Sequence, residues 1–336
     1  MTSLDRKVLR DVWSLRGQFS AIGAVIACGI GTFVMSLSTL DSLELTQARY
    51  YERYRFGHVF AHLKRAPDSL QSQLEAIPGV AEVQTRVVAD VVLDVPGLEE
   101  PAVGRLISVP ESGAPKMNAL YLRSGRFLEP GRAGEALVSE AFASAHGFVP
   151  GDKLSAVING RRETLSIVGV VLSPEYVYQI RGGEVFPNER SFGVFWVAEK
   201  ELAAAFDMKS AFNDLSCYLS PGASIPETLA SIDRLIDPYG GLGAYAREDQ
   251  ESHRYLTNEI RELRNMGLFA PIIFLLVAAF LLNVVLSRIV GAQRELIAAL
   301  KAFGYTRREI GLHYVKMVLT AVVAGALLGT ALGAWL

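Results

Sequence analysis

Three long windows of the chain contain no Asp, Glu, Lys or Arg: residues 17–40, 265–287 and 317–336. Each is about 20 residues long or longer, which is the length an α-helix needs to cross the hydrocarbon core of a membrane. One such window could be a buried helix of a globular protein. Three windows with basic flanks favour a membrane protein, and we predict three transmembrane helices.

The charges beside these windows predict the topology. Lys and Arg outnumber Asp and Glu by four to two in residues 1–16 and by six to two in residues 288–316. Short basic segments of this kind stay in the cytoplasm, whereas long domains are translocated largely regardless of charge. Residues 41–264 are therefore expected outside the cytoplasm. The net charge of −2 gives no sign of a nucleic-acid partner.

The two cysteines, Cys28 and Cys217, fall in a predicted span and in the outer domain, so we expect no disulfide between them. The basic N-terminus, the apolar run and Cys28 also resemble a lipoprotein signal. A cleaved signal turns polar soon after its short apolar region, but here the apolar run continues past Leu37. We favour a retained membrane helix and keep lipidation as the alternative.

The outer domain shows α+β patterns. Apolar periodicity and Pro/Gly breaks predict two β-α-β halves, from segments 58–64, 67–77, 80–93, 192–197, 215–219 and 225–236. A β-rich insert lies between the halves, with its clearest strand at 165–172 and glycine turns at Gly125, Gly131, Gly134, Gly151 and Gly160. The predicted fold class is membrane α-helical with a large α+β extracytoplasmic domain: one N-terminal transmembrane helix, this domain, and two further transmembrane helices.

Residues 247–264 have a helical pattern with Leu256, Ile260 and Leu263 on one stripe. No Pro or Gly interrupts it before the second window begins. Such a helix is either a rigid lever that continues into the membrane or a helix that packs on its own domain, and the pattern favours neither.

The segment between the second and third windows predicts a helical elbow. Residues 294–303 form an amphipathic helix with Leu296, Leu300 and Phe303 on one side, and Gly304 is placed where a helix end favours a left-handed residue. Thr306 and Glu309 match a capping box that starts the next helix.

Tyr305 and Ile310 complete this start as a hydrophobic staple. Arg307 and Arg308 fall in the first turn, where each cation opposes the helix dipole by roughly 0.3–1 kcal/mol. The two arginines therefore fix the topology, bind anionic lipid or contact a partner protein. A docking surface best explains the whole elbow.

The third window carries Gly325, Gly329 and Gly333 at intervals of four. Small residues at this spacing let helix backbones approach closely in lipid. The first window has a weaker version in Ala27 and Gly31. We predict a helix-packing face at the three glycines.

The elbow resembles the cytoplasmic loop of FtsX/MacB-like ABC transporter permeases. The matching residues are Arg294, Glu295, Leu296, Ile297, Ala299, Leu300, Lys301, Ala302, Phe303 and Gly304, then Thr306, Arg307, Arg308, Glu309 and Ile310, with Ala298 where the family has Gly. Residues 122–126 and 147–152 loosely resemble stretches of the family's periplasmic core domain.

The resemblance implies a non-catalytic permease in the bacterial inner membrane. It implies an ABC ATPase subunit that docks on the elbow, a second permease copy or repeat, and contact with membrane lipids and a periplasmic protein. ATP hydrolysis would move the outer domain (mechanotransmission), with residues 247–266 as the lever. Family members have at least four spans, so we expect the chain to be a fragment of a longer permease.

Other chemistry has little support. The chain contains no G-x-x-x-x-G-K-[ST], G-x-S-x-G or H-E-x-x-H motif. His58 and His62 are four apart on a strand with no third ligand in view, and His146, His253 and His313 are isolated in the sequence. We expect no catalytic residue, cofactor or metal, and a membrane-anchored enzyme is the weakest hypothesis.

Two functions remain, since one fold can serve both. The first is an ABC permease that exports or extracts an envelope substrate, and the second is an envelope regulator that controls a periplasmic enzyme. The expected domains are 1–16 cytoplasmic, 17–40 span, 41–264 outer domain, 265–287 span, 288–316 coupling elbow and 317–336 span.

Overall fold

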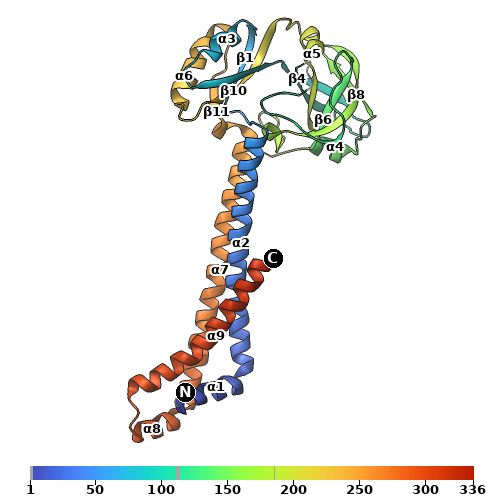
Figure 1. The fold of residues 1–336 in the computed structure, drawn as a ribbon. Coiled ribbons are helices and arrows are strands. Elements are labelled where there is room, and N and C mark those ends of the chain that lie inside the picture. Colours follow the sequence, from blue (N-terminus) through green and yellow to red (C-terminus); the bar gives the residue numbers. More distant parts are fainter. Residues whose placement is uncertain (1–2, 111–113, 185) are drawn as a thin grey trace. The chain divides into compact units, whose positions relative to one another are not determined.

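The computed structural model describes residues 3–110, 114–184 and 186–336. The chain forms two compact units (Figure 1). The helical unit comprises Met1–Thr46 and Glu259–Leu336, and the sheet unit comprises Gln47–Asn258.

A four-stranded antiparallel sheet forms the first part of the sheet unit. Its strand order is β11-β1-β10-β2, with β1 (Val59–Pro67), β2 (Val80–Arg86), β10 (Ala211–Leu219) and β11 (Ala244–Ala246). Helix α3 (Leu70–Glu75) connects β1 to β2, and helix α6 (Ile225–Ile236) connects β10 to β11. This is a split β-α-β arrangement. Leu70, Leu74, Ile232 and Ile236 of the two helices are buried in one core cluster with strand residues.

A seven-stranded mixed sheet forms the second part, inserted between β2 and β10. Its order is β5-β8-β6-β9-β4-β3-β7, and β7 also pairs with β8, which closes six strands into a ring. The strands are β3 (Val88–Asp94), β4 (Ala102–Val109), β5 (Tyr121–Gly125), β6 (Glu135–Ser139), β7 (Lys153–Ile158), β8 (Arg161–Leu172) and β9 (Phe192–Ala198). The short helices are α4 (Glu140–His146), α5 (Glu199–Ala205) and the 3-10 turns η1 (Pro174–Tyr176), η2 (Asp237–Tyr239) and η3 (Arg247–Asp249).

The predicted fold class is confirmed, with two corrections inside the sheet unit. The single strand expected at 80–93 is two strands that meet at Val87 and belong to different sheets. The strand expected at 192–197 belongs to the inserted sheet, where β9 pairs with β4 and β6. Local pattern cannot distinguish these cases, because sheet membership depends on pairing with strands far along the chain.

Five helices account for the rest: α1 (Ser3–Ser14), α2 (Arg16–Arg53), α7 (Glu251–Ala292), α8 (Arg294–Ala302) and α9 (Arg307–Trp335). In the described chain, α2, α7 and α9 are long and apolar enough to cross a membrane. Helices α2 and α7 contain the first and second uncharged windows, and α9 contains the third except for its last residue. Helix α7 runs through Pro271 without interruption. Cys28 lies inside α2, and both cysteines are free thiols.

Candidate functional site

The predicted elbow is a tight turn between α8 and α9. Gly304 has a left-handed backbone (φ 90°). Its N–H donates to the Lys301 carbonyl at 3.1 Å, and the Tyr305 N–H donates to the Leu300 carbonyl at 3.1 Å. These two bonds form a complete Schellman motif, which satisfies carbonyl groups at the end of α8. A side chain at position 304 would be strained in this backbone conformation.

The start of α9 is capped as predicted. The Thr306 hydroxyl oxygen accepts from the Glu309 N–H at 3.3 Å, and the Glu309 carboxylate accepts from the Thr306 N–H at 2.8 Å. Tyr305 and Ile310, the staple pair, join the same apolar cluster. The turn from α8 to α9 is thus fixed by both backbone and side-chain bonds.

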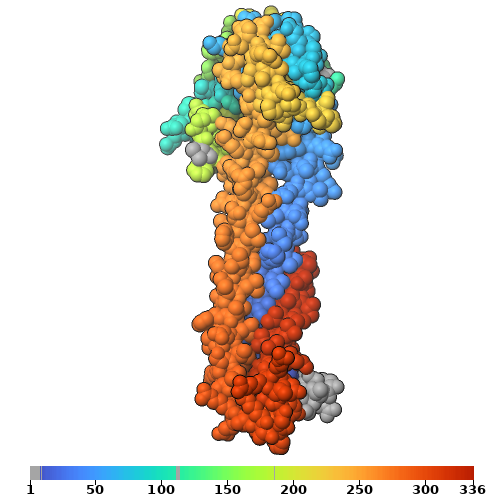
Figure 2. All heavy atoms as spheres, turned by 90° about the vertical axis from the view of Figure 1, so that its left-hand side faces the viewer, coloured from blue at the N-terminus to red at the C-terminus, as the bar shows by residue number. Residues whose placement is uncertain are grey.

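The elbow packs on the helical unit through one side of α8. Ile297 and Leu300 contact a cluster that includes Ile289 of α7 and Ile310 of α9. Figure 2 shows the red surface of α8 and α9 adjoining the orange surface of α7. Helix α1, which the sequence analysis does not predict, adds Val8 to this cluster.

The predicted apolar side of α8 is only partly correct. Leu300 packs inward, but Leu296 is 38% exposed and Phe303 is 82% exposed. Ile297, one residue further along, takes the inward place, because residues three apart share a helix face as well as residues four apart. Phe303 follows the last turn of α8 at the helix C-cap and points away from the cluster.

The exposed elbow residues form one candidate site, which we call the elbow surface. It consists of Arg294, Glu295, Leu296, Lys301, Phe303, Arg307 and Arg308. Within the ranges that the structure describes, none of its four cations forms an ion pair. Arg307 and Arg308 lie in the first turn of α9, where the helix dipole gives them no stabilisation.

The glycine face of α9 lies directly on α2. A Cβ atom built on Gly325, Gly329 or Gly333 would lie 2.7, 2.6 or 2.5 Å from the carbonyl oxygen of Gly23, Ala27 or Gly31, respectively. Real side chains do not tolerate such distances, so only glycine permits this approach. The register advances by four residues on both helices, which places small residues opposite each other throughout.

A second cluster, in the sheet unit, has no counterpart in the sequence analysis. Arg86 is 4% exposed and donates to Glu175 through two bonds of 2.6 and 2.8 Å. Its Nε donates to Asp214 at 2.7 Å, and Asp214 lies 2.7 Å from Nδ1 of His62. Burial alone would raise the pKa of Asp214, but Arg86 and His62 outweigh it and hold that pKa below its ordinary value. We call these four residues the Arg86 network.

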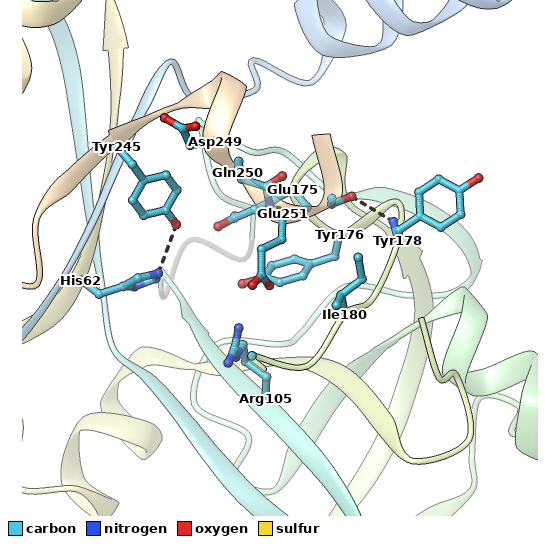
Figure 3. A pocket seen from close by; sticks show the side chains of 12 residues that line it. His62, Arg105, Glu175, Tyr176, Tyr178, Ile180, Tyr245, Asp249, Gln250 and Glu251 are labelled. Carbon is cyan, nitrogen blue, oxygen red and sulfur yellow. Dashed lines mark hydrogen bonds between the residues drawn. The ribbon is translucent and has the colours of Figure 1, made fainter. Parts of the chain in front are cut away.

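The Arg86 network borders a pocket of about 340 Å³ (Figure 3). Tyr245 of β11 lies 3.1 Å from Nε2 of His62 on one side, and the Arg105 guanidinium points into the pocket. Arg105 is already held by Asp90 at 2.8 and 3.1 Å. Most polar groups that line this pocket are therefore engaged by other parts of the sheet unit.

The same region holds the start of α7. The Gln250 side chain donates to the Glu175 carbonyl at 2.6 Å, and the Ser252 hydroxyl accepts from the Tyr178 N–H at 2.9 Å. Tyr51 near the end of α2 lies 3.1 Å from Nδ1 of His253 on α7. The first two bonds hold the start of α7 against the loop at Glu175–Tyr178, and the third joins the end of α2 to α7, all within the sheet unit.

The histidines have partners that their sequence positions do not reveal. His58 accepts from the Leu219 N–H at 3.1 Å, and His62 is committed to Asp214. His253 contacts Tyr51, and Nε2 of His313 lies 3.4 Å from the Asp11 carboxylate. Among the described residues, no group of three or more His, Cys, Asp or Glu could hold a metal ion.

Comparison with known proteins gives a match in the C-terminal part. Residues 268–336 match the family model described as FtsX-like permease C-terminal. A search of curated proteins finds no match. The extracellular domain of the noncanonic ABC-type transporter YknZ from Gram-positive bacteria is 14% identical, with TM-score 0.37, over 55% of this chain and 97% of that chain. The periplasmic region of MacB from Actinobacillus actinomycetemcomitans is 11% identical, with TM-score 0.36, over 61% of this chain and 92% of that chain.

The matched segment begins inside α7 and contains the whole of α8 and α9. It therefore includes the elbow surface and the glycine face. The chain carries an FtsX-like permease C-terminal segment at residues 268–336, and the family resemblance drawn from the elbow sequence is confirmed.

Proposed function

We propose that the chain is the permease subunit of an ABC transporter of the mechanotransmission type. A separate ATPase docks on the elbow surface in the cytoplasm, and the sheet unit acts outside the bacterial inner membrane. Helices α2, α7 and α9 are the spans, with a second permease copy or repeat completing the assembly. The permease itself carries no catalytic group.

The elbow surface is the observation that carries this proposal. A turn fixed by a Schellman motif and a capping box presents a phenylalanine that is 82% exposed. Lys301 and Arg307 lie within four residues of it in the sequence, and among the described residues neither forms an ion pair. An exposed aromatic side chain beside arginines is typical of the centre of a protein–protein interface. The position of this surface within the matched segment supports an ATPase as the partner.

Movement would pass through α7. This helix continues without a break from Glu251 to Ala292. Gln250, the residue before it, is bonded to Glu175 of η1, and Ser252 in its first turn is bonded to Tyr178. A continuous helix transmits displacement along its axis better than a helix broken by a loop. A change in position of the elbow would therefore reach the sheet unit through α7.

Copurification with candidate ABC ATPases tests the proposal. The full chain in detergent is compared with a Lys301→Glu, Arg307→Glu double variant. The matched control is Lys153→Glu, Lys209→Glu, which reverses two exposed charges in the sheet unit. We expect an ATPase to copurify with wild type and control and to be lost from the elbow variant. If no ATPase associates with any of them, the envelope-regulator function becomes the better account.

A further inference from the structure

A second cavity of about 490 Å³ lies within the sheet unit, apart from the Arg86 network. Its walls come from the end of α2, the residue before β1, the end of β10, η3 and the start of α7. The residues that matter for its chemistry are Tyr51, His58, Tyr218, Arg247 and His253. No motif in the sequence draws attention to it.

Arg247 is the central group of this cavity. Its Nε donates to the Gly57 carbonyl at 2.8 Å and its Nη2 donates to the Phe56 carbonyl. The guanidinium carbon lies 4.9 Å from the centre of the Phe56 ring and 5.6 Å from that of Tyr51. A guanidinium has five N–H donors, so the Nη1 edge keeps donors that no described residue uses.

No carboxylate in the described chain pairs with Arg247. Burial, the largest influence, lowers the pKa of its guanidinium, and only the tyrosines Tyr51 and Tyr218 act in the other direction. Glu52 and Glu248 also line the cavity, but both are exposed and neither forms an ion pair with Arg247. A half-buried cation without a counter-ion is unfavourable unless something supplies the negative charge.

His58 provides a second donor. Its Nδ1 accepts from the Leu219 N–H at 3.1 Å, so the proton of the neutral ring is on Nε2. Burial and then the charge of Arg247 lower the pKa of His58 to about 4, so the ring is neutral at pH 7. Burial and then Arg247 also lower the pKa of His253, although Glu248 opposes this.

We propose that this cavity binds an oxyanion, a carboxylate or phosphate group, between the free edge of Arg247 and the Nε2–H of His58. Arginine presents a planar fork of donors that suits both anions. The rings of Tyr51 and Tyr218 would pack against whatever carries the group. This proposal does not depend on the elbow surface or on the permease function.

The anion would come either from solution or from the headgroup of an acidic lipid, and the experiment distinguishes the two. The full chain in neutral detergent, with ¹³C-labelled histidine, is titrated with inorganic phosphate, with short-chain phosphatidic acid, and with chloride at equal ionic strength. The NMR signal of the His58 ring is followed against pH. Because a nearby anion favours the protonated ring, we expect binding to raise the His58 pKa.

Equal responses to phosphate and to phosphatidic acid indicate a soluble anion. A response to the lipid at a much lower concentration indicates a headgroup. If neither probe shifts His58 more than chloride does, the proposal is wrong, and Arg247 serves only to cap the Phe56–Gly57 turn.

Variants separate binding from folding. His58→Asn keeps an acceptor for the Leu219 N–H and removes the Nε2–H, because the shorter amide does not reach the Nε2 position. Arg247→Lys keeps the charge and removes the planar fork of donors. We expect each to weaken binding roughly tenfold, the value of one charge-assisted hydrogen bond, with the His253 signal as the readout in the first variant. Arg105→Lys, in the other pocket, is the matched control and should bind as wild type does. Unchanged binding in both cavity variants would contradict the proposal.

Discussion

Gly329 of α9 lies so close to Ala27 of α2 that a Cβ atom on the glycine would be 2.6 Å from the alanine carbonyl oxygen. An added methyl group must therefore separate the two helices. Gly329→Ala should lower the free energy of unfolding by about 1–3 kcal/mol, the usual cost of overpacking a well-packed contact.

Gly311 is the matched control on the same helix, because a Cβ atom there would meet no heavy atom within 4 Å. Gly311→Ala should stabilise the helix by up to about 1 kcal/mol through its better helix propensity. Thermal unfolding in detergent compares the two. Equal effects of the two substitutions would show that the α2–α9 contact does not determine stability.

The Arg86 network predicts a large loss on truncation. Arg86→Met leaves Glu175 and Asp214 buried without their cation, and breaking a buried ion pair in this way costs about 3–5 kcal/mol. Arg162→Met, which removes a pair with Asp94 at the exposed surface, should cost about 1 kcal/mol or less. Chemical denaturation of both variants, followed by a probe in the sheet unit, provides the measurement. A loss for Arg86→Met no larger than that for Arg162→Met would contradict a structural role of the network.

His62 gives the network a dependence on pH. Its hydrogen bond to Asp214 outweighs burial and raises its pKa above the ordinary value of 6.5. A group whose pKa is higher when folded contributes stability that is fully present below about pH 6.5 and is lost as pH rises through the folded pKa.

The difference in unfolding free energy between wild type and His62→Gln should therefore shrink as pH rises from about 6 to about 9. This range begins near the ordinary histidine pKa and extends above it. Using the difference cancels the titration of the other histidines. His146→Gln, at a partly buried position away from Asp214, is the control for the loss of an imidazole ring. A constant difference for His62→Gln would mean that the ring is not charged in the folded protein.

The membrane orientation can be tested with single cysteines. In a Cys28→Ala background, the remaining Cys217 should not react with maleimide. Burial raises the pKa of its thiol to about 12, and the thiolate is the reactive form. Lys209→Cys should then react with an impermeant maleimide added to spheroplasts whose inner membrane is intact. Lys301→Cys should react only after the membrane is permeabilised. The reverse pattern would overturn the proposed topology.

Much of the helical unit could be predicted from the sequence, because its signals are local. The absence of charge over about 20 residues, the left-handed position of Gly304 and the Thr306–Glu309 cap each depend on a few neighbouring residues. The glycine spacing predicts a packing face, but the partner helix is defined only by contact with Gly23, Ala27 and Gly31.

The sheet unit was less predictable, because its important contacts join distant residues. Arg86 reaches Glu175 and Asp214, which lie 89 and 128 residues away. In the sequence, Arg247 is one of several charged residues before a helix. Its role depends on the Gly57 carbonyl, which lies 190 residues away along the chain. The strand that ends at Arg86 also contains Glu82 and Gln84 at alternate positions, so the sequence pattern gives no signal that marks the first of these sites.

The affinity of the full chain for its ATPase, measured for wild type and Phe303→Asp, tests the central claim most directly. Phe303 is 82% exposed, so the substitution should leave the fold unchanged, and Leu242→Asp, at a residue 77% exposed in the sheet unit, is the matched control. We predict that Phe303→Asp weakens binding by at least about thirtyfold, as expected for a side chain at the centre of an interface, and that Leu242→Asp has no effect. An ATPase that binds wild type and Phe303→Asp equally well would contradict docking on the elbow surface.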